Sequence, residues 1–128
     1  LLNMIAAATV SRLFSVPDVK IVEGFRDFKS LPHRLEYFGN YHGIDFYNDS
    51  ISTIPESTVE ALKALKTVDT VVLGGYDRGI NYAPLVDHLT RYPVRHVILI
   101  GDAGRRIYQS LSQLTSNDMY CYVANDYR

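Results

Sequence analysis

Two short apolar runs that end in glycine constrain the fold of this sequence more than any other feature. Residues 70–73 and 97–100 are mainly β-branched and aliphatic, and they are followed directly by Gly74-Gly75 and by Gly101. Runs without alternating polar positions are typical of strands that are buried on both faces of a parallel sheet. Neighbouring parallel strands need a crossover connection, usually a helix, between them. The sequence therefore predicts repeated strand and helix units.

Helical patterns lie before, between and after these runs. Residues 82–89 place apolar side chains at the i, i+3, i+4, i+7 spacing of an amphipathic helix. Thr53 and Glu56 form a Thr-x-x-Glu capping box that predicts the start of another helix. Asp102 predicts the cap of a third helix, and residues 119–123 predict a last strand. We expect an α/β fold whose Rossmann-like, mostly parallel sheet has helices on both faces.

The first part of the chain predicts two further helices and a hairpin. Apolar patterns favour helices over residues 1–14 and 18–28. Short strands are expected over residues 35–38 and 43–47, joined by a tight turn at His42-Gly43. The chain begins and ends in mid-pattern, which is typical of a fragment.

The composition excludes several classes of protein. Apolar residues make up 47% of the 128 residues, charged residues 21%, and the net charge is −1, as in ordinary soluble domains. No stretch of about 18 uncharged apolar residues predicts a membrane span. No block of Lys or Arg gives the electrostatic footprint of a nucleic-acid binder. The single cysteine, Cys121, suits a reducing compartment and is expected to be apolar filler. We expect a cytoplasmic domain with no nucleic-acid partner and no membrane insertion.

Known phosphate-binding and metal-binding motifs are missing from the sequence. There is no GxxxxGK[ST] loop, and neither GGYDRG nor GDAGRR has the spacing of GxGxxG. The histidines and the cysteine do not form a cluster with metal-ligand spacing. We therefore expect neither a self-sufficient ATPase or NAD enzyme nor a metal site made by side chains of this chain.

The expected site lies at one edge of the sheet. In parallel sheets, the loops at the carboxyl ends of the strands carry the ligand-binding residues. Polar residues and glycines gather in four such loops, at residues 48–53, 74–81, 101–105 and 124–128.

Five polar residues in or near these loops are candidate site residues, and each has a structural alternative. His33 and Arg34 either belong to a site or form a salt-bridged linker. Asp49 either accepts hydrogen bonds from a ribose or forms an Asx turn. Thr53 is a candidate N-cap, which would leave nearby backbone N–H groups available to an anion. Arg78 is either a solvated charge or an anchor for a carboxylate or phosphate, because its planar fork suits oxyanions.

Three segments, in this order and spacing, resemble the Mur ligase family. They are LPHRLE at 31–36, GIDFYNDSISTIPEST at 43–58 and VVLGGYDRGINY at 71–82. The family pattern runs LPHR, strand, NDSKATN, helix, strand, GGxDKG, and the resemblance covers about residues 1–110. It is strongest to the members that add glutamate to UDP-N-acetylmuramoyl-L-alanine.

The resemblance also implies a domain organisation. LLNMIAAATV, residues 1–10, is similar to the segment that closes the central ATPase domain of the family. Residues 1–29 would then be the last helices and linker of that domain. Residues 30–128 would be the Rossmann-like C-terminal domain, truncated at its own C-terminus.

Roles for individual residues follow from the resemblance, position by position. Nucleotide contacts are implied for Asn3 beside the adenine, for His33 and Arg34 at the hinge between domains, and for Asp49 at the ribose. Arg34 would lie near the phosphates. Contacts with the incoming glutamate are implied for Thr53 and Arg78.

Two positions depart from the family pattern. Arg78 stands where the family usually has Lys, and Ile51 stands where the family has the Lys of NDSK. An Arg can still clamp a carboxylate, with a different reach. The loss of the cation at Ile51 leaves the amino acid open: D-glutamate, L-glutamate or another one.

The implied reaction is amide formation in the synthesis of peptidoglycan precursors. ATP and Mg²⁺ activate the substrate carboxylate as an acyl phosphate, and these parts are held mainly by the central domain of the same protein. We expect a monomer, and no activity from residues 1–128 alone. Two alternatives stay open: a free-standing Rossmann-like module that binds a nucleotide or peptide, and an interaction domain that uses its ten tyrosines.

Overall fold

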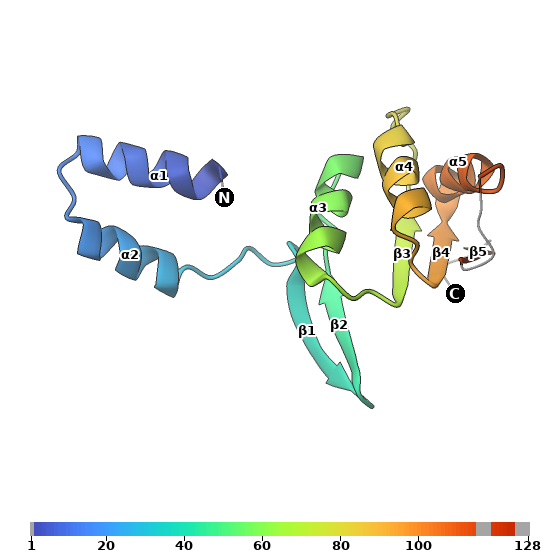
Figure 1. Cartoon of the computed structure of the whole chain (residues 1–128), viewed down its shortest axis with the longest axis horizontal. Helices are drawn as coiled ribbons and strands as arrows, with labels where there is room; N and C mark the ends of the chain where they lie inside the picture. Colours follow the sequence, from blue (N-terminus) through green and yellow to red (C-terminus); the bar gives the residue numbers. More distant parts are fainter. Residues whose placement is uncertain (1, 115–118, 125–128) are drawn as a thin grey trace. The chain divides into compact units, whose positions relative to one another are not determined.

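The structure is a computed structural model, and it describes residues 2–114 and 119–124. The chain divides into two compact units, Leu1–Pro32 and His33–Arg128, which are described separately below (Figure 1). Among the described helices, none has both the length and the hydropathy that a membrane span requires.

The first unit consists of two helices, as predicted. Helix α1 spans Leu2–Leu13 and helix α2 spans Asp18–Asp27, with Ser15 at φ 57° in the turn between them. Arg12 Nε donates a hydrogen bond of 2.8 Å to Asp18 across this turn. No residue of either helix is buried. Two helices of this length without buried side chains do not provide a hydrophobic core of their own.

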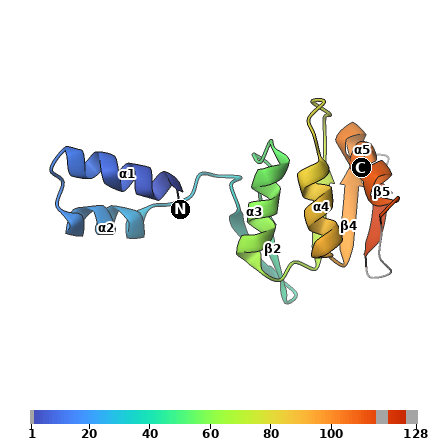
Figure 2. The same cartoon turned by 45° about the horizontal axis from the view of Figure 1, so that its top comes forward.

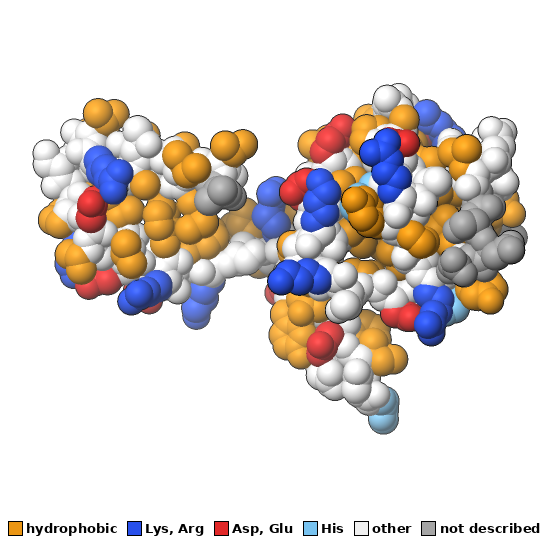
Figure 3. Space-filling view, in the orientation of Figure 1, with side chains coloured by type: hydrophobic (Ala, Val, Ile, Leu, Met, Phe, Trp, Pro, Cys, Tyr) orange, Lys and Arg blue, Asp and Glu red, His pale blue; other side chains and the backbone are white. Residues whose placement is uncertain are grey.

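The second unit begins with the predicted β-hairpin. Strands β1 (Glu36–Tyr41) and β2 (Ile44–Asn48) pair antiparallel as a separate two-stranded sheet. His42 and Gly43 both have positive φ, at 53° and 84°, which is the conformation that two-residue hairpin turns require. Hydrophobic side chains gather on the surface of this hairpin (Figure 3), where Phe38 is 64% exposed. A lone hairpin is marginally stable, so its contacts with the following segment matter.

The rest of the second unit is a parallel α/β arrangement. A three-stranded parallel sheet has the order β3-β4-β5, and helices α3 and α4 lie side by side (Figures 1 and 2). The elements in chain order are α3 (Pro55–Leu65), β3 (Thr70–Gly74), α4 (Ala83–Arg91), β4 (His96–Ile100), α5 (Gly101–Leu111) and β5 (Tyr120–Ala124). The predicted Rossmann-like α/β class is confirmed.

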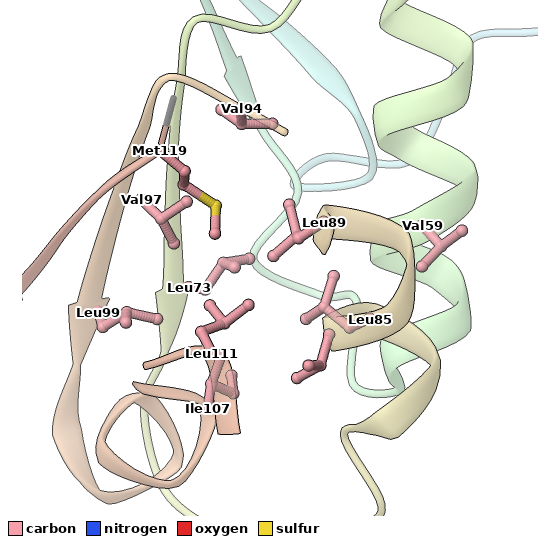
Figure 4. Close-up of a cluster of buried hydrophobic side chains, with 11 residues drawn as sticks. Val59, Leu73, Leu85, Leu89, Val94, Val97, Leu99, Ile107, Leu111 and Met119 are labelled. Atoms are coloured by element: carbon pink, nitrogen blue, oxygen red, sulfur yellow. The ribbon is translucent and has the colours of Figure 1, made fainter. Parts of the chain in front are cut away.

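One hydrophobic core lies between the sheet and the helices. Side chains from α4, α5 and the strands point toward one another in Figure 4, and Leu89, Val97, Leu99 and Leu111 are fully buried. The amphipathic pattern at residues 82–89 correctly predicted that Leu85 and Leu89 face this core.

Within the second unit, the described helices cover one face of the sheet, whereas helices on both faces were expected. Leu73, Val97 and Leu99 point into the core, but Val72 on the opposite face is 58% exposed and Tyr122 is 50% exposed. An apolar run without alternation indicates a strand suited to burial on both faces. It does not indicate which segment covers the second face, and within the second unit residues 33–114 and 119–124 provide no such cover.

Two predicted helix caps are wrong. Helix α3 begins at Pro55, with Ile54 at the N-cap and no side-chain capping bond, so Thr53 and Glu56 do not form a capping box. Proline is strongly favoured at the first helical position, and this preference sets the start. Helix α5 likewise begins at Gly101 rather than after an Asp102 cap, because the chain turns directly from β4 into the helix.

Candidate functional site

The loop that follows β3 is fixed to the start of α5 by backbone contacts. Gly75 N donates a hydrogen bond to Ile100 O at 2.8 Å, and Ala103 N donates to Gly75 O at 3.1 Å. Gly74 has φ 126°, and a Cβ at this position would lie 2.0 Å from Ile100 O. Only glycine fits at position 74 without a shift of the backbone. Gly74, the last residue of β3, and Gly75, the first residue after it, therefore join this loop to the end of β4.

The carboxylate of Asp77 organises the loop itself. Gly79 N donates a hydrogen bond of 2.9 Å to Asp77 Oδ1, and Tyr82 Oη donates one of 3.3 Å to the same atom. Arg106 on α5 donates from Nη1 to both oxygens, at 2.7 and 2.8 Å. The hydrogen bond from Arg106, and then that from the Gly79 amide, lowers the pKa of Asp77 below its ordinary value. Asp77 is therefore ionised at neutral pH.

Arg78 lies at the exposed part of this loop, between Asp77 and Gly79. Among the described residues, no hydrogen bond or ion pair engages its guanidinium group, while its neighbour Asp77 is paired with Arg106. The donors of the Arg78 guanidinium are therefore not used by any of the described residues, and the planar fork of an arginine suits an oxyanion such as a carboxylate.

A second group of predicted residues meets where β2 ends. Leu35 N donates a hydrogen bond of 2.8 Å to Asp49 Oδ1, and Ser52 Oγ donates one of 2.6 Å to Asp49 Oδ2. Ser52 N also donates to Asp49 O at 3.0 Å. The bond typical of an Asx turn is made by the neighbouring Asn48, whose Oδ1 accepts a hydrogen bond of 3.1 Å from Ser50 N. The side chain of Asp49 instead joins the segment before β1 to the segment after β2.

His33 lies at the same corner as Asp49. Its Nδ1 is 2.8 Å from Nδ2 of Asn48 in a hydrogen bond, and its carbonyl accepts from Ile51 N at 3.3 Å. His33 itself has φ 63°, an uncommon conformation for a residue other than glycine. Arg34 is exposed in the segment that starts this unit. The structure therefore brings His33 and Asp49 together through the end of β2.

The other predicted site residues are placed separately. Thr53 is exposed in the segment before α3, and Asn3 is exposed on α1 of the first unit. No hydrogen bond among the described residues links the Arg78 loop to the Asp49 corner. The predicted loop at 124–128 lies outside the described residues except for Ala124. The ligand-binding roles of these residues stay predictions.

Two surface hollows in the described part of the chain are lined by neither Arg78 nor Asp49. One, of about 460 Å³, is lined by Arg105, Tyr108, Gln109, Cys121 and Val123. The other, of about 320 Å³, lies among Leu62, Lys66, Val68, His88, Arg91, Tyr92, Pro93 and Val94. Partial burial raises the pKa of the Cys121 thiol, which agrees with an inert side chain.

Arg106 and Asp77 were not predicted as site residues. GDAGRR was considered only as a phosphate loop, and the two partners are 29 positions apart in the sequence. Nothing in the sequence pattern indicates which loop an outward-facing arginine on this helix meets.

No group of three or more His, Cys, Asp or Glu side chains that could hold a metal ion occurs among the described residues. Residues 2–114 and 119–124 therefore offer no cluster of the carboxylate type that usually binds Mg²⁺.

Comparison with known proteins relates this chain to ligases. No family model matches the chain. The UDP-N-acetylmuramoylalanine–D-glutamate ligase of Geotalea daltonii is 38% identical over 113 residues, which are 88% of this chain and 25% of the relative. The ligase of the same name from Caldanaerobacter subterraneus subsp. tengcongensis is 37% identical over 105 residues, 82% of this chain and 23% of the relative. The predicted resemblance to the Mur ligases is confirmed.

This Mur ligase-like chain spans about a quarter of the length of the curated relatives it matches. A further ligase of the same name, from Solibacter usitatus, is 37% identical over 110 residues, which are 86% of the chain. The matched segments cover 88% and 82% of the chain. They therefore include the loop that carries Arg78 and the corner that carries Asp49.

Proposed function

We propose that the chain is the glutamate-binding part of a ligase that joins glutamate to UDP-N-acetylmuramoyl-L-alanine in peptidoglycan precursor synthesis. The observation that carries the proposal is the 38% identity over 88% of the chain to a ligase of that name. It is supported by the ordered segments LPHRLE, GIDFYNDS and GGYDRG. In this proposal the chain is the C-terminal domain of a cytoplasmic, monomeric enzyme, preceded by the end of a central ATPase domain.

Arg78 is proposed to bind a carboxylate of the incoming glutamate. Its guanidinium is exposed, and the described part of the chain leaves it without an ion pair. An exposed Arg on a loop tied to a helix can make two parallel hydrogen bonds to one carboxylate. The hydroxyl of Thr53 is proposed as a second contact. These contacts hold the amino acid so that its amine is placed for attack on the activated carbonyl.

Nucleotide contacts are proposed for Asn3, His33, Arg34 and Asp49. Leu35 N and Ser52 Oγ each use one acceptor position of the Asp49 carboxylate. An ionised carboxylate has about four such positions, so Asp49 can still accept hydrogen bonds from ribose hydroxyls. Arg34 supplies positive charge suited to phosphate oxygens. ATP, when bound, supplies the phosphoryl group that activates the muramoyl carboxylate.

The phosphate loop and the ligands of Mg²⁺ are proposed to belong to the rest of the protein. The sequence has no GxxxxGK[ST] loop, and the described residues offer no metal-binding cluster. The first unit, whose two helices contain no buried residue, suits a segment that packs on a larger domain. Residues 1–128 alone are therefore proposed to be inactive, with the segment around residues 30–34 as the hinge for closure.

A ligase specific for L-glutamate is the second candidate. Ile51 is 44% exposed in the loop after β2, where the family pattern has Lys. An isoleucine cannot donate a hydrogen bond or supply charge to a substrate carboxylate. The presence of Ile51 in place of this Lys therefore favours a different geometry of the bound amino acid from that of the usual family members.

Phosphate release tests the proposal directly. The full-length protein that contains this chain is given ATP, Mg²⁺ and UDP-N-acetylmuramoyl-L-alanine, with either D-glutamate or L-glutamate. Release with D-glutamate supports the main proposal, and release only with L-glutamate supports the second candidate. No release with either one contradicts both. Residues 1–128 alone serve as the negative control, and muramoyl-dependent release from them would contradict the proposed need for a separate ATPase domain.

A further inference from the structure

We infer that Arg106, together with Asp77, is a positioning residue that holds Arg78 in place for the amino acid substrate. The inference rests on the proposed function, because it assigns a use to the loop that carries Arg78. Arg106 lies on α5 and is not expected to touch the substrate itself.

Arg106 contacts the loop on both sides of Arg78. Before Arg78, it donates two hydrogen bonds to the Asp77 carboxylate, at 2.7 and 2.8 Å. After Arg78, its Nη2 donates one of 3.2 Å to the carbonyl of Ile80. Its guanidinium carbon also lies 5.2 Å from the centre of the Tyr82 ring, within cation–π range. One side chain thus spans the loop from residue 77 to residue 82.

The helix that carries Arg106 is itself rigidly placed. Ile107 and Leu111, on the core-facing side of α5, are 2% and 0% exposed. Gly104 packs so closely on β4 that a Cβ there would lie 2.9 Å from the carbonyl carbon of Leu99. Because close packing fixes α5 on the sheet, the hydrogen bonds of Arg106 fix the loop relative to the sheet as well.

The pair differs from an ordinary surface ion pair. The side chain of Asp77 is 20% exposed, and Arg106 approaches both of its oxygens. Isolated surface pairs contribute little, but partly buried pairs with several hydrogen bonds restrict geometry more strongly. Asp77 also binds the Gly79 amide at 2.9 Å, so both neighbours of Arg78 in the chain belong to one network.

Arg105 is the matched control on the same helix. Its only ion pair among the described residues is with Asp102, at 3.8 Å within α5, and both side chains are more than half exposed. It has the same charge and helix propensity as Arg106, but among the described residues it makes no hydrogen bond or ion pair with residues 77–82.

The test uses the full-length protein and the variants Arg106→Ala, Arg106→Lys, Arg105→Ala and Arg78→Ala. We expect Arg106→Ala to raise the KM for glutamate about five- to tenfold and to leave kcat within about twofold of the unmodified value. The reason is that the variant loses the contacts that position Arg78 for glutamate binding. Arg106→Lys should recover part of the loss, since an ammonium group can make one of the contacts. Arg105→Ala should leave KM unchanged.

Hydrogen exchange of the Gly79 amide provides a readout that does not depend on activity. Arg106→Ala should speed exchange at Gly79 and at its loop neighbours, whereas Arg105→Ala should not. If Arg106→Ala matches Arg105→Ala in both KM and exchange, the positioning role is contradicted. If Arg78→Ala leaves the glutamate KM unchanged, the proposed role of the loop fails, whatever the exchange data show about Arg106.

Discussion

Asp49 accepts a hydrogen bond of 2.8 Å from the backbone nitrogen of Leu35 and thereby joins the end of β2 to the segment that precedes β1. Leu35 has φ 44°, in the left-handed region that is costly for a residue other than glycine. The second oxygen of Asp49 accepts from Ser52 Oγ at 2.6 Å. One half-buried carboxylate therefore fixes the backbone on both sides of the hairpin.

Replacement of Asp49 by alanine should destabilise the protein. The substitution leaves the Leu35 amide without its acceptor, so we expect the free energy of unfolding to fall by about 1–3 kcal/mol. Urea denaturation of the full-length protein measures this change. Ser52→Ala, which removes only one of the two side-chain contacts, should cost less. An equal or larger effect of Ser52→Ala would show that the bond to Leu35 contributes little.

Three glycine substitutions separate backbone strain from steric clash. Gly74→Ala should lower the free energy of unfolding by more than about 2 kcal/mol, because the added Cβ meets Ile100 O and φ is positive. Gly79→Ala has a positive φ of 70° but open space around its Cβ, so its cost should be about 1 kcal/mol. Gly24→Ala, in α2 with nothing within 4 Å, should be neutral or stabilising.

Thermal unfolding of the three glycine variants, compared with the unmodified protein, gives their order. If the Gly74→Ala protein is as stable as the Gly79→Ala protein, the distance between Gly74 and Ile100 O must be large enough to admit a Cβ.

The pair of Asp77 and Arg106 should stabilise the fold in a pH-dependent way. Arg106 lowers the pKa of Asp77 in the folded state relative to the ordinary value of 3.8. A lowered pKa means that the stabilisation is complete above the unfolded-state value and is lost as the pH falls through the folded-state value. The difference in free energy of unfolding between the unmodified protein and Asp77→Asn should therefore be constant above about pH 5 and shrink below about pH 4.

Denaturation of both proteins across this pH range measures the difference. Asp102→Asn, which removes a carboxylate from an exposed pair within α5, is the control for the loss of one negative charge. A difference that grows as the pH falls would have the wrong sign for this pair.

Local sequence patterns predicted the elements well because their causes are local. The His42-Gly43 turn predicted the hairpin, since both residues adopt the positive φ that such turns require. The spacing of Leu85 and Leu89 predicted the buried face of α4 because a helix repeats every 3.6 residues. Where two local preferences compete, the prediction failed: Pro55 rather than Thr53 sets the start of α3.

Contacts between distant segments were not predictable in the same way. The sequence indicated that Arg78 lies in a loop at the sheet edge, but not that Arg106 holds this loop from 29 positions beyond Asp77. Likewise, the apolar side chain of Val72 fits a buried strand, yet it is 58% exposed in the described residues. Periodicity indicates that a side chain suits burial, and only the fold shows what it meets.

The role of Arg78 is the central claim, and the KM for glutamate of the full-length Arg78→Ala protein tests it most directly. We expect KM to rise at least about tenfold, because a bidentate contact with the substrate carboxylate is lost. Arg95→Ala, an exposed arginine that precedes β4 at the opposite end of the sheet, should leave KM unchanged. An Arg78→Ala protein with the KM of the Arg95→Ala protein would contradict the assignment of Arg78 to the amino acid.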